Sequence, residues 1–377
     1  LKAGDGTSTI TPTDWNLLGY FTFDIPAESG EYTVLANETD KTIHYQLGNL
    51  TVRNANSAST ATAKMELGSS MLKLSGGSNQ QTPKFIVETS TTLNSTNARA
   101  LWLSSWSTLS VGNNSALLVN GNLYSAQEQE NAGITVNVAA GSTLKATGST
   151  ILKHATITLD GTLETDGALA FENSTLTANN SIKANSTASF LNTNATIADS
   201  FTTGGATTVT NSTLNISGTF TSDGTITFDG ATVDLLNDTA KISATATKGG
   251  KSQIIIKNGS SITGDGTLVM NMGGNTIDET SSVDVLKIQT GAGQTVPVLG
   301  SLRTRSNTTY NNLSVSGTLE QLVGDETVFN RAASFEAGST FKTASNYIRI
   351  QAGTVDAAYT TLSIDAANKS FVVGSEN

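Results

Sequence analysis

The chain has 377 residues, of which 37% are hydrophobic and only 14% are charged, and it contains 35 glycines, 4 prolines and no cysteine. A formal net charge of -10 argues against nucleic acid as a partner, because phosphate binding requires a surface of Lys and Arg. The lack of cysteine excludes disulfides and cysteine metal sites and is compatible with an exported bacterial protein. The abundant Thr and aliphatic residues favour strands, whereas Asn and Gly favour tight turns, so we expect an all-β protein. No apolar run of about 18 residues occurs, and we therefore predict no transmembrane segment.

The first fifty residues are rich in aromatic side chains and include Trp15, Tyr20 and Phe21. We predict that residues 1–50 form a cap, since the open strand edge at the end of a repeat protein needs protection from pairing with other chains. The alternative is an aromatic surface for assembly or for a ligand. The first ten residues lack the apolar core of a signal peptide, which fits a mature chain or one whose leader has been removed.

Two tryptophans lie close together in the segment LWLSSW, residues 101–106. Trp102 and Trp106 are four residues apart, so we predict that they point the same way on one strand. Packing in the core or at a corner is the preferred interpretation, and a platform on which sugars stack is the alternative. The segment AQEQENAG that follows, residues 126–133, reads as a loop expanded from one corner.

A period of 19 residues runs through residues 143–237, with apolar residues recurring in phase at four positions of each unit. Such a fixed period is the signature of a repeat architecture, and the recurring apolar residues are predicted to face inward. The predicted core columns are Leu163, Ile182, Phe201 and Phe220; Phe171, Phe190, Val209 and Phe228; Leu176, Leu214 and Val233; and Ile197, Ile216 and Leu235.

The turn residues follow the same period, with Asn173, Asn192 and Asn211 at one corner. Asn is one of the few residues that tolerate a left-handed backbone. We predict that the three amides form a ladder up this corner. Asn173 and Asn211 also begin Asn-x-Ser/Thr triplets, for which glycosylation is the alternative interpretation.

Each unit holds three short strands separated by short corners, which are too closely spaced for an immunoglobulin-like sandwich. We therefore predict a right-handed parallel β-helix, a β-solenoid with about 19 residues and three strands per rung, because parallel crossovers are almost always right-handed. The β-helix is expected to span residues 51–365, with corner-loop insertions near 126–133 and 246–252. Residues 366–377 are expected to form a C-terminal tail or the end of the solenoid.

Motifs for chemistry are missing from the sequence. It contains no HExxH, no GxSxG and no phosphate loop, so we predict no catalytic residue, no cofactor and no metal site, and hence no enzyme. The GDG at residues 264–266 is interpreted as a solvated turn rather than part of a calcium site. Asp223 and Asp229 fall on different corners, whereas a glycan-cleaving β-helix needs paired carboxylates on one face. A polysaccharide-binding or polysaccharide-cleaving β-helix remains the alternative.

One predicted strand of the repeat presents paired threonines to the outside. Thr156 and Thr158 are followed one period later by Thr175 and Thr177. This double file resembles the T-x-T faces of ice-binding solenoids and makes ice binding a further alternative. Asn and Asp interrupt the file in later units, and Thr is also what an exposed strand prefers, so a plain solvated face is the simpler interpretation.

Units such as STLNISGTFTSDGTITFDG, residues 212–230, resemble the rungs of bacterial autotransporter passengers and of filamentous-haemagglutinin-like adhesins. The resemblance covers roughly residues 100–340. It implies a non-enzymatic surface or secreted protein that acts as an adhesin stalk or as a self-assembling, fibre-forming structural protein. Its partners would be other copies of itself or a glycan or protein of a host or cell surface, and its location would be extracellular or on the bacterial surface. A full autotransporter ends in a β-barrel that is not seen here, so we expect a processed passenger, a fragment or a fibre subunit.

Overall fold

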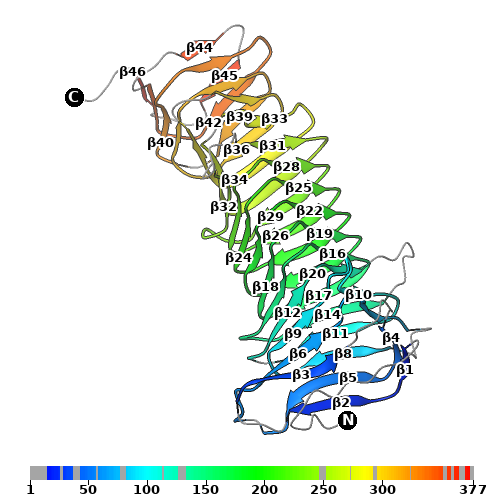
Figure 1. The fold of residues 1–377 in the computed structure, drawn as a ribbon. Coiled ribbons are helices and arrows are strands. Elements are labelled where there is room, and N and C mark those ends of the chain that lie inside the picture. The colour runs from blue at the N-terminus through cyan, green and yellow to red at the C-terminus, as the bar shows by residue number, and fades with distance from the viewer. Residues whose placement is uncertain are drawn as a thin grey trace. The chain divides into compact units, whose positions relative to one another are not determined.

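The computed structural model describes residues 15–25, 29–36, 43–56, 58–76, 82–112, 114–125, 133–245, 252–271, 273–291, 295–322, 324–350, 355–357, 361–364 and 370–373. These residues form 46 strands and no helix (Figure 1). The chain divides into two units, residues 1–195 and residues 196–377, and each is described by itself.

In the N-terminal unit the strands form three parallel ladders, because each strand pairs with the third strand after it (Figure 1). The first ladder consists of β1 (Trp15–Leu18), β4 (Ile43–Leu47), β7 (Leu72–Leu74), β10 (Leu101–Leu103), β13 (Leu123–Ser125), β16 (Thr150–Lys153), β19 (Leu169–Glu172) and β22 (Ala188–Leu191). The second consists of β2 (Phe21–Ile25), β5 (Asn49–Asn54), β8 (Lys84–Val87), β11 (Thr108–Val111), β14 (Ile134–Val138), β17 (Ala155–Leu159) and β20 (Thr175–Ala178). The third consists of β3 (Glu31–Ala36), β6 (Thr62–Glu66), β9 (Thr91–Asn94), β12 (Ala116–Asn120), β15 (Thr143–Ala146), β18 (Thr162–Thr165) and β21 (Ile182–Ala184). β23 (Asn194–Ile197) contains the boundary between the units.

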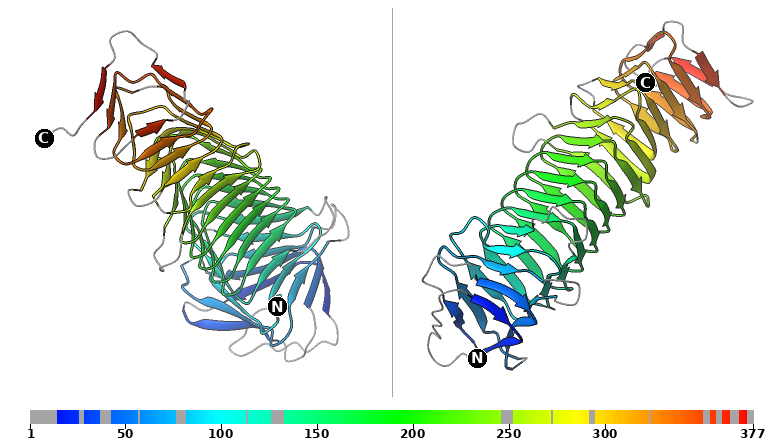
Figure 2. Two further views of the ribbon diagram at one scale, coloured as in Figure 1. Left: turned by 90° about the horizontal axis from the view of Figure 1, so that it is seen from above. Right: turned by 90° about the vertical axis from the view of Figure 1, so that its right-hand side faces the viewer.

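The C-terminal unit is built in the same way, as the parallel arrows of Figure 2 show. One ladder contains β25 (Thr207–Thr210), β28 (Ile226–Asp229), β31 (Ile254–Lys257), β33 (Thr276–Ile277), β35 (Val296–Val298), β38 (Leu313–Val315), β41 (Ala333–Phe335) and β44 (Val355–Ala357). A second contains β26 (Thr213–Ile216), β29 (Thr232–Leu235), β32 (Ser261–Met270), β34 (Ser282–Thr290), β36 (Ser301–Thr304), β39 (Thr318–Gln321), β42 (Thr340–Thr343) and β45 (Thr361–Ile364). A third begins with β24 (Ser200–Thr203), β27 (Thr219–Ser222) and β30 (Lys241–Ala244), and a four-stranded sheet holds β37 (Thr308–Tyr310), β40 (Glu326–Phe329), β43 (Tyr347–Ile350) and β46 (Ser370–Val373). The predicted all-β parallel solenoid is thereby confirmed.

The predicted core columns lie inside both units. All of their side chains are at most 1% exposed. In the N-terminal unit Phe171 is in register with Phe190, and their ring centroids lie 5.4 Å apart. In the C-terminal unit Phe201 is in register with Phe220, and the two rings stack with their centroids 4.4 Å apart. Burial of one such ring contributes about 1.5–3 kcal/mol, so these columns stabilise each unit from within.

The distance along the chain between paired residues varies. Leu144 pairs with Leu163, and Leu163 pairs with Ile182, both in phase with the period seen in the sequence. Other pairs are further apart, such as Leu101 with Leu123. Extra residues are accommodated between the strands, and the strands themselves keep their register.

The asparagine corner has the left-handed backbone that its sequence predicts. The φ angles of Asn173, Asn192 and Asn211 are 49°, 49° and 47°. Within the N-terminal unit, the Asn192 side-chain amide donates a hydrogen bond to the Asn173 side-chain oxygen over 3.1 Å. Each Asn thus allows the left-handed backbone of its corner, and Asn173 and Asn192 also stabilise neighbouring rungs through the hydrogen bond between their side chains.

The GDG segment lies inside a strand and is not a free turn. β32 pairs with both β29 and β30, and its register with β34 shifts between Gly264 and Thr267. Gly264 has a φ of 113°, and a Cβ there would lie 2.2 Å from the carbonyl oxygen of Leu235. The glycine is required because the bulge brings two backbones into contact.

Several segments that the sequence marks as irregular are described only in part. The strands within residues 15–50 belong to the same parallel ladders as those that follow, with Trp15 in register with Ile43 and Phe21 with Leu50. The insertions near 126–133 and 246–252 lie outside the described residues except at Gly133 and Ser252, and within 366–377 only residues 370–373 are described.

We expect Asn173→Ala to destabilise the protein by about 1–2 kcal/mol more than Asn173→Gly, because a Cβ strains a left-handed backbone. Both variants lose the amide bond to Asn192, so the difference between them isolates the backbone. Urea denaturation followed by circular dichroism measures the free energy of unfolding. Equal losses in the two variants would contradict this account of the corner.

Candidate functional site

The aromatic residues near the N-terminus do not form one surface. Tyr20 is 81% exposed. Phe21 is half-buried and meets the buried Tyr45 edge to face, with ring centroids 6.2 Å apart. The Tyr45 hydroxyl donates to the carbonyl oxygen of Gly19, and burial raises the pKa of Tyr45 to about 12. The backbone of Trp15 lies in β1, and its side chain is outside the described part of the structure. Among the aromatic side chains of this set that the structure describes, Tyr20 is the most exposed.

The prediction that Trp102 and Trp106 share one strand is wrong. β10 ends at Leu103, and Trp106 lies in the following turn with a φ of 56°. The turn forms because the buried Ser107 hydroxyl donates a 2.6 Å hydrogen bond to the Ser104 carbonyl oxygen, which ends the strand early. The two tryptophans therefore take part in two different sites.

Trp102 belongs to a group of basic and aromatic side chains, here called the Arg99 cluster, which comprises Lys73, Arg99, Trp102 and Tyr124. Lys73, Trp102 and Tyr124 are the central residues of β7, β10 and β13, and they are in register. Because the residues on either side of Lys73 and of Trp102 are buried leucines, these middle residues form one outward column.

Arg99 enters the cluster from the loop that precedes β10. The Asn97 side-chain oxygen accepts a 2.9 Å hydrogen bond from the Arg99 backbone nitrogen, which shapes this loop. Arg99 Cζ lies 4.9 Å from the Trp102 ring centroid and 4.9 Å from that of Tyr124. Lys73 Nζ lies 4.5 Å from the Trp102 ring centroid. The rings thus hold two cations together through cation–π contacts.

His44 borders the Arg99 cluster. It is in register with Lys73, on the neighbouring strand β4. Burial, and to a lesser degree the charge of Lys73, lower the pKa of His44 below its ordinary value of 6.5. At neutral pH His44 therefore adds no positive charge next to Lys73.

Trp106 forms the wall of a separate groove, here called the Trp106 groove, with a volume of about 330 Å³. Its lining residues are Trp106, Gly133, Ile134, Thr135, His154, Ala155, Thr156, Asn173 and Thr175. A Cβ at Gly133 would lie 2.2 Å from the Trp106 ring, so a glycine is needed where the ring packs. The floor includes an outward threonine file, because Thr135, Thr156 and Thr175 are in register on β14, β17 and β20. An aromatic wall beside hydroxyl and amide groups suits a sugar ring.

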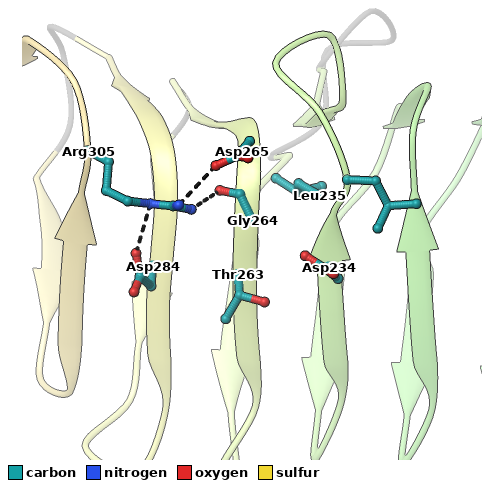
Figure 3. A pocket seen from close by; sticks show the side chains of 8 residues that line it. Asp234, Leu235, Thr263, Gly264, Asp265, Asp284 and Arg305 are labelled. Carbon is teal, nitrogen blue, oxygen red and sulfur yellow. Dashed lines mark hydrogen bonds and ion pairs between the residues drawn. The ribbon is translucent and has the colours of Figure 1, made fainter.

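A second pocket, here called the Arg305 pocket, has a volume of about 370 Å³, lies in the C-terminal unit and contains the carboxylates of Asp234, Asp265 and Asp284 (Figure 3). Figure 3 shows Arg305 reaching between two of them. Its Nη1 lies 2.9 Å from Asp265 Oδ1, and its Nε lies 3.3 Å from Asp284 Oδ1. Arg303 Nη1 also approaches Asp284 Oδ2, at 3.4 Å. Asp265 and Asp284 are therefore neutralised by arginines, unlike a carboxylate pair arranged for acid–base catalysis.

No group of three or more His, Asp and Glu side chains is arranged to hold a metal ion in the part of the chain that the structure describes. Among the same residues, none belongs to a helix that could cross a membrane.

Sequence reasoning missed Lys73, Arg99 and Tyr124. The signal available was local: the segments LKL at 72–74, LWL at 101–103 and LYS at 123–125 each place one outward residue between two inward ones. The rungs that carry them differ in length, so the constant period of residues 143–237 does not align them.

No family model matches the sequence, and neither a curated protein nor a solved structure matches the chain. The fold itself defines a class, that of parallel β-solenoid repeat proteins.

We expect the free energy of unfolding to fall as the pH drops from 6.5 through the lowered pKa of His44, because the unfolded chain then binds more protons than the folded protein. His44→Asn should remove this part of the pH dependence. Urea denaturation at several pH values between 8 and about 5 measures it. Lys73→Gln should reduce the slope without removing it, since burial is the larger cause. An unchanged slope in His44→Asn would contradict the assignment.

Proposed function

We propose that the protein is a non-enzymatic β-solenoid that acts outside the bacterial cell, as an adhesin stalk or as a structural subunit that self-associates. The observation that carries the proposal is that several outward charges of the regular strands form ion pairs between neighbouring strands. Their partners lie in the same protein, one strand away, which is expected of a scaffold that provides length.

The ion pairs follow the ladder register. Lys145 lies 3.4 Å from Glu164, and Lys153 lies 2.5 Å from Glu172, each pair being directly in register. In the C-terminal unit Arg303 stands in register between Asp284 and Glu320 and contacts both. An exposed pair stabilises by only about 0–1 kcal/mol, but a slipped register would lose all of these pairs at once.

We also propose that the solenoid is a right-handed β-helix with rungs of about 19 residues, similar to autotransporter passengers and filamentous-haemagglutinin-like adhesins. The pairing of Leu163 with Ile182 and of Phe201 with Phe220 supports this rung length in the regular part. The neutralised carboxylates of the Arg305 pocket support a binding or structural role over glycan cleavage.

Electron microscopy of intact, antibody-labelled bacteria that produce the protein tests the proposal. We expect label on the outer surface, as isolated rods for an adhesin or as fibres for a structural subunit. Label that appears only after the cells are permeabilised would refute the proposed location. Release of new reducing or unsaturated ends from pectin or alginate by the purified protein would refute the non-enzymatic role.

The Trp106 groove favours a second function, polysaccharide binding without cleavage. The exposed face of the groove combines an aromatic ring with the hydroxyls of Thr135, Thr156 and Thr175. Neutral sugars are recognised by such a combination, in which the ring covers the apolar face of the sugar and the polar groups bind its hydroxyls.

Trp106→Asn should weaken binding of a neutral oligosaccharide such as cellohexaose at least tenfold, because it removes the stacking ring and Asn tolerates the left-handed backbone at this position. Isothermal titration calorimetry of the full chain measures the affinity. Trp102→Phe is the matched control and should bind like the unaltered protein. Equal affinities of the unaltered protein and Trp106→Asn would exclude the groove as the site.

A further inference from the structure

We propose that the Arg99 cluster binds the carboxylate groups of an acidic polysaccharide, with Arg99 and Lys73 as the anion-binding residues. This inference goes beyond the scaffold role and concerns a surface separate from the Trp106 groove. It rests on the geometry of four side chains and on the lack of a carboxylate beside them among the described residues.

The two rings fix the position of the Arg99 side chain. Its guanidinium carbon lies 4.9 Å from the ring centroids of both Trp102 and Tyr124, which restricts the otherwise flexible exposed side chain. Cation–π contacts of this kind involve the face of a ring and leave the N–H groups of the guanidinium available. Those groups form a planar fork that matches the two oxygens of a carboxylate.

The cluster lacks a negative charge of its own among the described residues. Neither Lys73 nor Arg99 takes part in an ion pair there, although Lys145, Lys153 and Arg303 all pair with an acid in register. The column in register with Lys73 continues through His44 on one side and through Trp102, Tyr124 and Ile151 on the other, without an Asp or Glu. Two cations that contact the same ring repel each other, and a bound anion would relieve this repulsion.

The chemistry of the cluster narrows the class of anion. A polysaccharide of uronic acids carries one carboxylate per sugar, and the planar fork of Arg99 suits that group. The half-buried Tyr124 and Ile151 offer apolar surface to the rest of the sugar.

The test is binding of oligogalacturonate to the full chain, measured by calorimetry and by tryptophan fluorescence. We expect saturable binding that changes the fluorescence, with the fluorescence change lost in Trp102→Phe. Arg99→Gln should weaken binding at least tenfold, and Arg99→Lys, which keeps the charge and loses the fork, should also weaken it. The matched control is Lys183→Gln, which removes an exposed cation of the same unit that contacts no ring among the described residues, and it should change affinity less than twofold.

Two ligands act as controls for the chemistry. Methyl-esterified oligogalacturonate keeps the sugar backbone and masks the carboxylates, so it should not bind. Heparin carries sulfates in addition, and preferential binding of heparin would overturn the assignment to carboxylate.

The proposal also fails if oligogalacturonate does not bind, or if Arg99→Gln and Lys183→Gln weaken binding equally, since that would show a general charge effect. Circular dichroism and the thermal midpoint of each variant confirm that it is folded before its affinity is compared. Failure of this test would leave the scaffold role untouched, because that role is judged by location and assembly.

Discussion

In-register parallel pairing of neighbouring strands is the constraint on which the rest of the structure depends. It places each side chain beside its equivalent in the next strand, so residues of one type at equivalent positions line up in a column along the solenoid. Apolar side chains form buried columns, as with Phe201 and Phe220. Asparagine side chains form hydrogen-bonded corners, as with Asn173 and Asn192. The same rule would bring equal charges together, and the chain avoids this by alternating acid and base along its outer columns.

The side chains that we propose as ligand-binding residues lie where the residue types of the regular columns change. The corner at Trp106 has a left-handed backbone like the asparagine corners, but it carries an aromatic ring that packs beside Gly133 and lines a groove. In the Arg99 cluster, rings take the positions where acids would neutralise the cations, and the positive charges remain available. The Arg305 pocket shows the opposite outcome, because its arginine is used to hold carboxylates on neighbouring strands together.

In this solenoid the residues that stabilise the fold differ from the aromatic and basic residues of the outward face. The buried columns and paired charges give each unit its stability and register, and they offer little to a ligand. Lys73, Trp102 and Tyr124 on the outward face and Trp106 in its corner are not part of the buried core, so substitutions there should cost the fold little. These positions can therefore be changed while the scaffold is retained.

The sequence by itself determined the all-β class, the inward columns and the asparagine corners, because a constant spacing in residues 143–237 maps one position of the chain onto one position of the fold. It also marked Trp102 and Trp106 as unusual, but assigned both to one strand. Only the tertiary structure decided that Trp106 lies in a turn and that Lys73, Trp102 and Tyr124 share one column with Arg99 above it. The physical reason is that hydrogen bonds between strands set the register. Where rungs differ in length, residues in register are not separated by a constant number of residues, so a fixed period in the sequence does not reveal the register.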